Sequence, residues 1–267
     1  MSVIALSPFD LALAAVLVVA LAMLTAAVGM GLSRSLVVSA VRTVVQLLLI
    51  GLVLKVLFDL EHPALIGLMA LVMLLAAGRE VMARQQRRFS GLWGYGLGTL
   101  AMFVSSFSVT ILALAVVIGP TPWYQPQYSI PLLGMLLGNT MNGISLGLDR
   151  LTQTAWRERR SIEARLILGH AWSQAITSIR REAARTGLMP MVNAMAAAGI
   201  VSLPGMMTGQ ILAGVPPMEA VKYQILIMFL ITAGTGFGTL AAVWLGSRRL
   251  FDERQRLRLD RLMAARD

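Results

Sequence analysis

Long apolar runs, separated by short polar segments, dominate the pattern of this chain of 267 residues. A membrane hydrocarbon core about 30 Å thick is crossed by about 20 helical residues, so runs of this length predict transmembrane helices. The pattern therefore predicts an all-α fold, a polytopic membrane protein with about seven transmembrane helices in a single domain over residues 1–267. The seven apolar runs lie at about 8–30, 36–58, 63–78, 92–118, 130–148, 188–212 and 223–246.

The sixth apolar run contains helix-breaking residues. Pro190 lies at its start and is expected to open a helix, and Pro204 and Gly205 interrupt the run after the stretch 199–203. Proline has no amide hydrogen, and the carbonyls that it frees inside a bilayer must be satisfied by protein or by a wet cavity. Two interpretations stay open: a kink that serves helix packing, or a break that lines a pathway. The pattern also leaves open whether this run crosses the membrane fully or re-enters.

Basic residues gather on one side of the predicted spans. Twenty of the 23 Lys and Arg residues lie at Arg34 or in the segments 79–88, 150–185 and 248–266. Cytoplasmic loops of membrane proteins carry an excess of Lys and Arg, which places these segments inside and makes 248–267 a basic cytoplasmic tail. Seven spans then put the amino terminus outside.

Composition supports lipid as the solvent of this chain. Apolar residues make up 57% of it, charged residues 13%, and the mean hydropathy is +0.74, outside the range of ordinary soluble domains. The net charge of +10 follows from the positive-inside bias, because the Arg residues flank apolar runs and are not interleaved with aromatic residues. We therefore expect contact with the lipid bilayer and no nucleic-acid partner. The chain has no cysteine, which excludes disulfides and thiolate metal sites.

Few polar residues fall within the predicted spans, and each is a candidate for function because it is costly to place in lipid. Arg42 and Gln46 lie one turn apart on one face of the second run; Arg42 either snorkels to the cytoplasm or has a buried partner or gating role. Asn139, Asn142 and Asn193, in the fifth and sixth runs, either make interhelical hydrogen bonds or line a polar path. Apart from Asp10 at the start of the first run, no Asp or Glu lies inside any run as bounded above, which argues against a proton relay or a hard-cation cage.

Methionine is abundant, with 17 residues, and several crowd around the interrupted sixth run. Thioethers favour soft ions such as Cu(I) over ferrous iron, but methionine also fills gaps in apolar packing, so the sequence assigns no metal. The interruption adds four candidate path or gate residues to the polar ones, namely Pro204, Gly205, Met206 and Met207.

Small residues recur at the spacing of close helix packing. Gly143 with Gly147, and Gly234 with Gly238, are two such pairs. Each pair lets another helix approach closely, either within the chain or in a dimer. The spacing does not choose between the two.

Signatures of an enzyme are missing from the sequence. His62 and His170 lie far apart without metal-ligand spacing, and no Gly-x-Ser-x-Gly nucleophile turn occurs. A phosphate-binding loop needs Gly-Lys followed by Ser or Thr, and neither Lys in the chain follows a Gly. We therefore predict a transport protein that has no ATP site of its own, binds no cofactor and is not an enzyme.

The segment 150–187 is the most unusual part of the chain, because its 38 residues exceed what a turn between adjacent helices requires. Apolar residues recur in it at intervals of three and four, with Arg, Glu and Gln between them, which predicts a long amphipathic cytoplasmic segment. Such a segment either lies on the membrane surface or docks on a cytoplasmic partner. The candidate coupling residues are Glu163, Ala164, Gly169, Trp172 and Ile179.

Part of this segment resembles a known motif. Glu163-Ala164 with Gly169 and Ile179 partly resembles the EAA loop by which many ABC permeases contact their ATPase. The third position of the motif is Arg165 here, and no Leu-Pro pair directly follows the isoleucine.

Longer stretches resemble one family. The block 199–214, which reads GIVSLPGMMTGQILAG, is similar to the FetB family of ABC transporter permeases, as are residues 138–151 and Arg42 with Gln46. The resemblance runs from about residue 36 to 246. It implies a bacterial inner-membrane permease, a homodimer paired with a separate ATP-binding subunit that holds ATP and Mg²⁺. It also implies iron export and resistance to oxidative stress, while related plant proteins are associated with aluminium tolerance.

We therefore expect the permease subunit of an ABC exporter that moves iron or a related metal species out of the cytoplasm. In this mechanism the amphipathic segment sits in a groove of the ATPase, and closure of the ATPase rocks the spans, with Pro204 and Gly205 as a hinge or lining element. The alternative is an ATPase-independent secondary transporter or channel for metal or another small solute. An intramembrane enzyme would need a clustered acid, base or metal site, which the sequence does not show.

Overall fold

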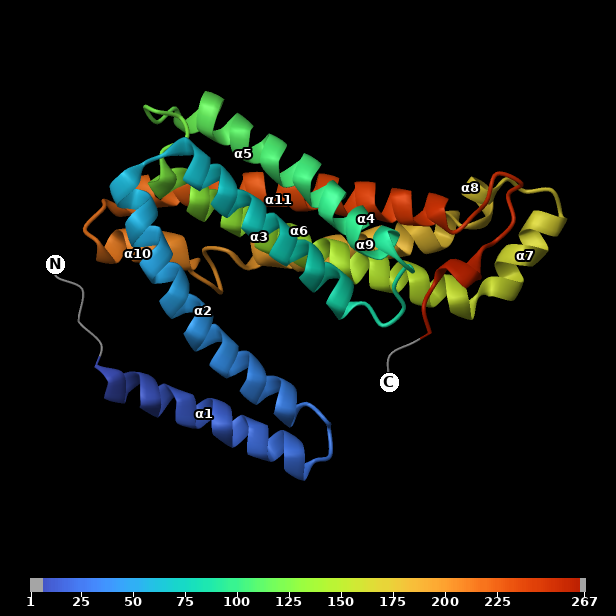
Figure 1. Ribbon diagram of the computed structural model, residues 1–267, viewed down its shortest axis with the longest axis horizontal. Helices are drawn as coiled ribbons and strands as arrows, with labels where there is room; N and C mark the ends of the chain where they lie inside the picture. The colour runs from blue at the N-terminus through green and yellow to red at the C-terminus, as the bar shows by residue number, and fades with distance from the viewer. Residues whose placement is uncertain (1–6, 265–267) are drawn as a thin grey trace.

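Helices form the architecture of this protein (Figure 1). The computed structural model describes residues 7–264, and no β-strand forms within that range. The helices are α1 (Pro8–Ala27), α2 (Ser33–Leu60), α3 (Pro63–Arg84), α4 (Leu92–Met102), α5 (Ser108–Leu112), α6 (Pro126–Arg157), α7 (Arg159–Ile167), α8 (Trp172–Ala175), α9 (Thr177–Ala197), α10 (Gly205–Leu212) and α11 (Pro217–Arg249).

Five helical segments of the described residues are long and apolar enough to cross a membrane, namely α1, α2, α3, α11 and the segment Leu92–Ile118. The last of these joins α4 and α5 through π-helical turns and so behaves as one continuous helix. The prediction of an all-α, polytopic membrane protein is confirmed.

The helix of the fifth predicted run, α6, lies in the middle of the bundle and contacts α3, α9 and α11. It extends beyond the run 130–148 at both ends and is continuous through Pro131. Its polar residues Asn139 and Asn142 make it less apolar than the outer spans. Because other helices surround α6, it has less need of a uniformly apolar surface than a helix that faces lipid.

The sixth predicted run is two helices joined by a turn. Pro190 lies inside α9, so the expectation that it opens a helix is wrong. Transmembrane helices tolerate an internal proline where neighbouring helices support the freed carbonyl. Residues 198–204 then leave the helix in a turn closed by the N–H of Gly199, which donates to the Ser202 carbonyl at 2.9 Å, and α10 begins at Gly205. The predicted interruption is confirmed.

The amphipathic segment 150–187 is built into the bundle. α6 and α9 supply its two ends, while α7 and α8 form the turn between them. Ile162, Ile176 and Ile179 are at most 2% exposed and belong to the main hydrophobic core. Much of the apolar face predicted from the sequence is therefore covered by the chain itself.

Glycines set the closest helix approaches in the bundle. A Cβ atom on Gly187 of α9 would lie 2.4 Å from the carbonyl oxygen of Gly143 in α6. A Cβ atom on Gly238 of α11 would lie 2.6 Å from Ser105 Oγ. In lipid, where apolar surface gives little drive for helix association, such close backbone approach is a main source of packing energy. The glycine spacing thus serves contacts within the chain.

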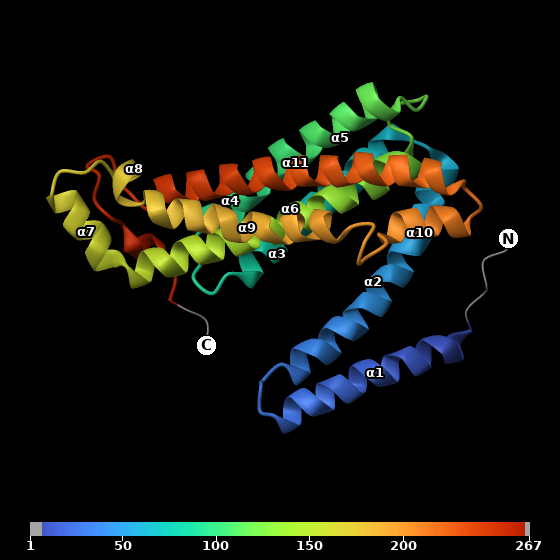
Figure 2. The same cartoon turned by 180° about the vertical axis from the view of Figure 1, so that it is seen from behind.

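α1 and α2 form an arm that leaves the bundle, as both ribbon views show (Figures 1 and 2). Of the described residues in α2, only Leu57 is buried, near the connection to α3. α1 packs along α2 and buries Ala22 and Thr25. The remaining apolar surface of the arm is exposed in the single chain, so in a membrane it faces lipid or another protein.

Candidate transport path and coupling site

Four charged or polar side chains from α2, α3 and α6 meet in one cluster. Arg42 Nη2 lies 2.6 Å from Glu80 Oε1, and Arg84 Nε lies 3.9 Å from Glu80 Oε2. Arg84 Nη1 also donates to Asn142 Oδ1 at 2.5 Å. We name Arg42, Glu80, Arg84 and Asn142 the ion-pair cluster. It ties the arm to two helices of the bundle.

Glu80 corrects the expectation that no carboxylate lies within a span. The third run was bounded at residue 78 because Arg79 and Glu80 follow it, but α3 continues to Arg84. The side chain of Arg42 is 52% exposed and that of Glu80 is 27% exposed, so both stay within reach of water. Of the two alternatives for Arg42, the structure favours a partner. Arg42 lies inside the second run and Glu80 lies just after the third. These opposite charges on consecutive helices were the signal that could have revealed the pair.

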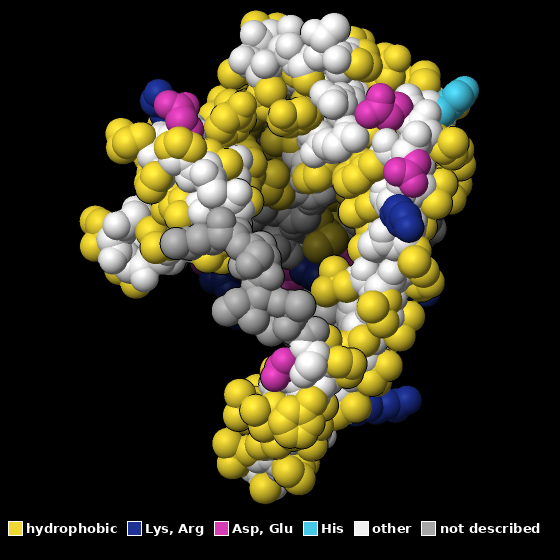
Figure 3. Space-filling model, turned by 90° about the vertical axis from the view of Figure 1, so that its left-hand side faces the viewer, with side chains coloured by type: hydrophobic (Ala, Val, Ile, Leu, Met, Phe, Trp, Pro, Cys, Tyr) yellow, Lys and Arg dark blue, Asp and Glu magenta, His cyan; other side chains and the backbone are white. Residues whose placement is uncertain are grey.

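The molecular surface is hollowed between the arm and the bundle. Figure 3 looks into this hollow, and shows the arm on the right and dark blue and magenta side chains deep inside. Yellow apolar side chains cover much of the visible surface around it. The hollow therefore combines an apolar rim with charged groups at depth.

The remaining polar path candidates lie apart from the ion-pair cluster. Gln46 and Asn193 are exposed in the single chain. Asn139 Nδ2 donates to a carbonyl of its own helix at 2.8 Å, whereas Asn142 bonds between helices, to Arg84. The structure thus joins Asn142 to Arg42 through Arg84 and Glu80. The amides of Gln46, Asn139 and Asn193 lie apart from this cluster.

The turn before α10 borders a cavity of about 550 Å³. Pro204 and Met207 line it, together with residues of α9 and α11. Met206 packs against the core cluster that α6 and α11 share, and Gly205 is the first residue of α10. Two of the four candidates at the interruption therefore face this cavity.

At the end of the molecule that carries α7, this helix and the carboxyl-terminal tail border a groove of about 650 Å³. Glu163 and Gly169 line one side, and the tail residues 254–257 line the other. Beside the groove, Ile167 and Leu168 are 86% and 77% exposed. Adjacent exposed apolar side chains beside a polar groove are a candidate contact surface. We name Ile167, Leu168 and the groove the coupling surface.

Two of the predicted coupling residues face inward. Ile179 is 2% exposed. Trp172 is held by the tail. Its backbone N–H donates to Gln255 Oε1 at 2.9 Å, and the centroid of its indole ring lies 5.7 Å from that of the Phe251 ring. The guanidinium of Arg248 adds a cation–π contact at 5.3 Å. The predicted coupling residues exposed to a partner are Glu163, Ala164 and Gly169.

The tail folds back along this end of the bundle instead of extending from it. The N–H of Ser90 donates to the carbonyl of Arg261 at 2.8 Å, and the N–H of Met263 donates to the carbonyl of Arg88 at 2.9 Å. These bonds fix the tail to the connection between α3 and α4. Residues 265–267 of the predicted basic tail lie outside the described range.

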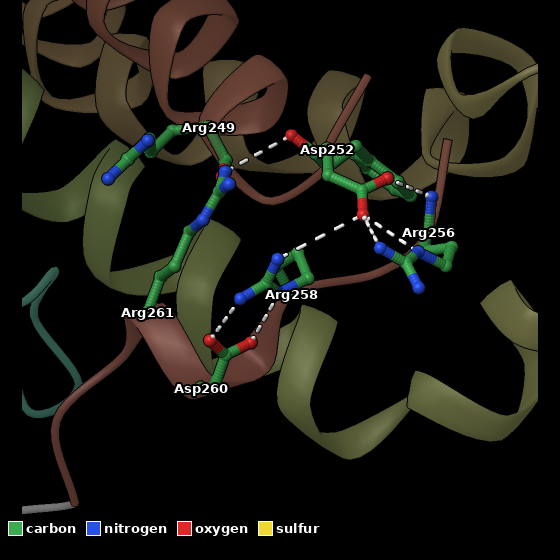
Figure 4. A network of polar contacts seen from close by, with 7 residues as sticks. Arg249, Asp252, Arg256, Arg258, Asp260 and Arg261 are labelled. Carbon is green, nitrogen blue, oxygen red and sulfur yellow. Dashed lines mark hydrogen bonds and ion pairs between the residues drawn. The ribbon is translucent and has the colours of Figure 1, made fainter. Parts of the chain in front are cut away.

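Acidic residues neutralise part of the basic charge of the tail (Figure 4). Arg256 pairs with Asp252 and Arg258 with Asp260, each at 2.8 Å. The hydrogen bond from the Arg258 side chain lowers the pKa of Asp260 to about 2. The N–H of Arg256, which donates to the Asp252 carboxylate, lowers the pKa of Asp252 as well. Both carboxylates are therefore held in the charged form.

Hard-metal ligands do not gather in the part of the chain that the structure describes. No group of three or more His, Cys, Asp or Glu residues there could hold a metal ion. The ion-pair cluster contributes one carboxylate, and that carboxylate is already paired with Arg42. The residues of the ion-pair cluster can form and break ion pairs, but they do not form a cage for a hard cation.

Residues 8–251 match the model of a family described as an uncharacterised protein family, UPF0014. The chain belongs to UPF0014. The match covers the transmembrane helices and α7 to α9 but not the tail after residue 251. No solved structure matches the chain.

Other UPF0014 members cover most of the chain. It is 41% identical over 233 residues to UPF0014 membrane protein slr1647 of Synechocystis, across 86% of this chain and 88% of the relative. It is 32% identical over 253 residues to the probable iron export permease protein FetB of Escherichia coli, across 93% of both. It is 31% identical over 233 residues to protein ALUMINUM SENSITIVE 3 of Arabidopsis thaliana, across 87% and 83%. The predicted resemblance to the FetB family is confirmed.

Proposed function

We propose that this protein is the membrane-spanning subunit of an ABC exporter that moves iron or a related metal species out of the cytoplasm. Two copies form the transport unit, and a separate ATP-binding subunit holds ATP and Mg²⁺. The name of the Escherichia coli relative, a probable iron export permease, supports the cargo. The exposed pair Ile167 and Leu168 beside the groove carries the proposal, because a permease driven by another subunit needs a surface for it.

The helix α6 runs from the ion-pair cluster to the start of α7, which carries the coupling surface. α6 carries Asn142 in the cluster and ends at Arg157, directly before α7. Arg150 of α6 forms an ion pair with Glu182 of α9, which couples these two helices. A displacement of α7 by a docked ATPase therefore has to pass only the short connection at Glu158 before it reaches α6, Asn142 and, through Asn142, Arg84.

The ion-pair cluster serves as an inner gate in this proposal. Arg42 of α2 and Glu80 of α3 hold the arm to the bundle. An ion pair that water can reach is worth about 1 kcal/mol or less, so a movement driven by ATP can break it in each cycle. Once it breaks, the arm is free to move and the hollow can open toward the cytoplasm.

The distribution of charge supports an orientation with the amino terminus outside and the carboxyl terminus in the cytoplasm of a bacterium, with the chain in its inner membrane. In that setting iron export also protects against oxidative stress. Topology reporters fused after residues 61, 125, 218 and 267 test this orientation. Reporters at 61, 125 and 218 should report the outside and the one at 267 the inside.

The central experiment measures uptake of ferrous iron into inverted membrane vesicles. The chain is expressed alone, with an ATP-binding subunit encoded beside it, and with an ATPase-inactive variant of that subunit. We expect ATP-dependent uptake only with the active pair. Uptake by the chain alone would instead support the ATPase-independent transporter, and no iron uptake by the active pair would refute iron as the cargo.

A second experiment tests the coupling surface. Because the chain has no cysteine, single replacements are unambiguous targets for cross-linking. Ile167→Cys and Leu168→Cys should cross-link to the ATPase in a nucleotide-sensitive way. Ile179→Cys, at a buried position of the same segment, is the matched control and should not react. Equal yields at all three positions, or none at the first two, would refute docking at this surface.

A further inference from the structure

The cavity beside α10 is lined by three methionines from three helices. Met195 comes from α9, Met207 from α10 and Met228 from α11. Methionine often fills gaps in apolar packing, but here the three residues border about 550 Å³ of open space. A ligand in this cavity would lie beside all three methionines.

Gln224 adds a polar group to the same cavity. It lies one helical turn before Met228 on α11, so both side chains project from the same helix face. The residue is 8% exposed, and its Oε1 atom is buried with no hydrogen-bond partner. A buried acceptor without a partner costs free energy, and native structures keep few of them outside sites that bind something. A cation is one partner that this oxygen can take.

The donor set selects the class of cation. Thioethers are soft ligands that suit Cu(I), whereas ferrous iron and other harder ions prefer nitrogen and carboxylate oxygen. The Thr232 hydroxyl lies 3.2 Å from Met195 Sδ, which helps to fix the position of that sulfur. The residues that line the cavity include no acidic residue, so a divalent ion would lack compensating charge there. A monovalent soft cation has the smallest desolvation cost among metal ions.

We infer that this cavity binds a soft monovalent cation, Cu(I) or its analogue Ag(I), through the sulfurs of Met195, Met207 and Met228 and the carbonyl of Gln224. The site lies where the chain leaves the helix at residues 198–204, and Gly199, Leu203 and Pro204 of this turn line the cavity together with the three methionines. The claim that the bound ion is transported cargo rests on the proposed exporter function. Binding itself does not.

The test titrates Ag(I), and Cu(I) buffered with a chelator, into the purified full chain in nanodiscs without ATPase. The wild type should bind one ion per chain, and X-ray absorption of the Cu(I) form should show sulfur neighbours. Met195→Leu and Met207→Leu keep the volume but remove the sulfur, and each should weaken binding at least about tenfold, or 1.4 kcal/mol. Gln224→Leu should weaken it less.

Met30→Leu and Met263→Leu are matched controls at exposed positions away from the cavity, and they should bind as the wild type does. Thermal unfolding of each variant checks that the fold is kept. Ag(I) affinity that is unchanged in both cavity variants would overturn the inference, as would ferrous iron binding as tightly as Ag(I). Loss of ATP-driven transport with Ag(I) binding intact would count against the exporter function alone. Transport of iron with no Ag(I) site would count against this inference alone.

Discussion

The arm and the bundle have similar apolar sequences but opposite environments. α2 and α11 both satisfy the length and composition of a membrane span, yet none of the apolar window of α2 is buried and 44% of that of α11 is. The difference lies in the small residues. A Cβ on Gly51 of α2 would meet nothing within 4 Å, whereas one on Gly238 of α11 would meet Ser105 at 2.6 Å.

This contrast separates two steps of membrane-protein folding. Apolar composition is sufficient to place a helix in lipid. As the arm shows, it does not by itself make that helix pack against others. Close backbone approach then selects which helices associate. The helices of the bundle have associated in this way, while the arm contacts the bundle at few points, among them the pair Arg42–Glu80.

The largest effect is expected from a methyl group added inside the bundle. Gly187→Ala places a Cβ 2.4 Å from a backbone oxygen of α6, which cannot move aside as a side chain would. We expect a loss of about 3 kcal/mol in the free energy of unfolding, measured by denaturation in detergent micelles. Gly51→Ala on the arm is the control and should be neutral or stabilising by up to about 1 kcal/mol. Equal stability of the two variants would show that the contact is not tight.

A smaller effect is expected from releasing the arm. Arg42→Gln removes the ion pair to Glu80, and because water reaches both groups the cost should be about 1 kcal/mol. The distribution of distances between spin labels on α2 and α3 should broaden. The charge-reversed pair R42E with E80R should restore a narrow distribution. Distances that stay narrow in Arg42→Gln would show that other contacts hold the arm.

The docking of the tail should respond to acid. Asp252 and Asp260 have pKa values below the ordinary 3.8, that of Asp260 at about 2, so their pairs stabilise the docked tail above pH 3.8. This contribution is lost as the pH falls from 3.8 toward 2. A spin label attached at neutral pH to the buried position 262, through Leu262→Cys, should become more mobile over this range. A label mobility that stays constant would contradict the role of these pairs.

The smallest effect is expected on the outer face of the arm. Leu48→Ala removes a side chain that is 67% exposed, so stability of the single chain should change by about 0.5 kcal/mol or less. Leu136→Ala, at a fully buried position of α6, leaves a cavity and should cost more. If the order were reversed in the purified protein, the arm would be buried in an assembly of two chains.

Much of the fold followed from local sequence properties. Five of the seven apolar runs coincide with helical segments of the described residues that are long and apolar enough to cross a membrane, and Pro204 with Gly205 predicted the interruption near α10. Pro190 misled because its effect depends on the neighbours that support the helix around it. The end of α3 was also missed, since Arg79 and Glu80 end an apolar run without ending a helix.

The candidate site was less accessible from the sequence. Arg42 and Asn142 were recognised as costly polar residues, but Glu80 and Arg84, which join them, lie 38 and 58 residues from their partners along the chain. Trp172 was a candidate for contact with a partner, yet its ring packs against Phe251 of the tail. No local pattern reports such pairings.

The sequence by itself determined that this protein lies in a membrane, how its charge is distributed, which family it resembles and where one helix breaks. These properties are sums over contiguous residues, because partition into lipid and helix interruption depend on the local chain. Only the tertiary structure decided that the arm stands apart, that the amphipathic segment turns its apolar face inward, and that three methionines meet around one cavity. These depend on how closely helices approach each other, which glycines and distant partners set together.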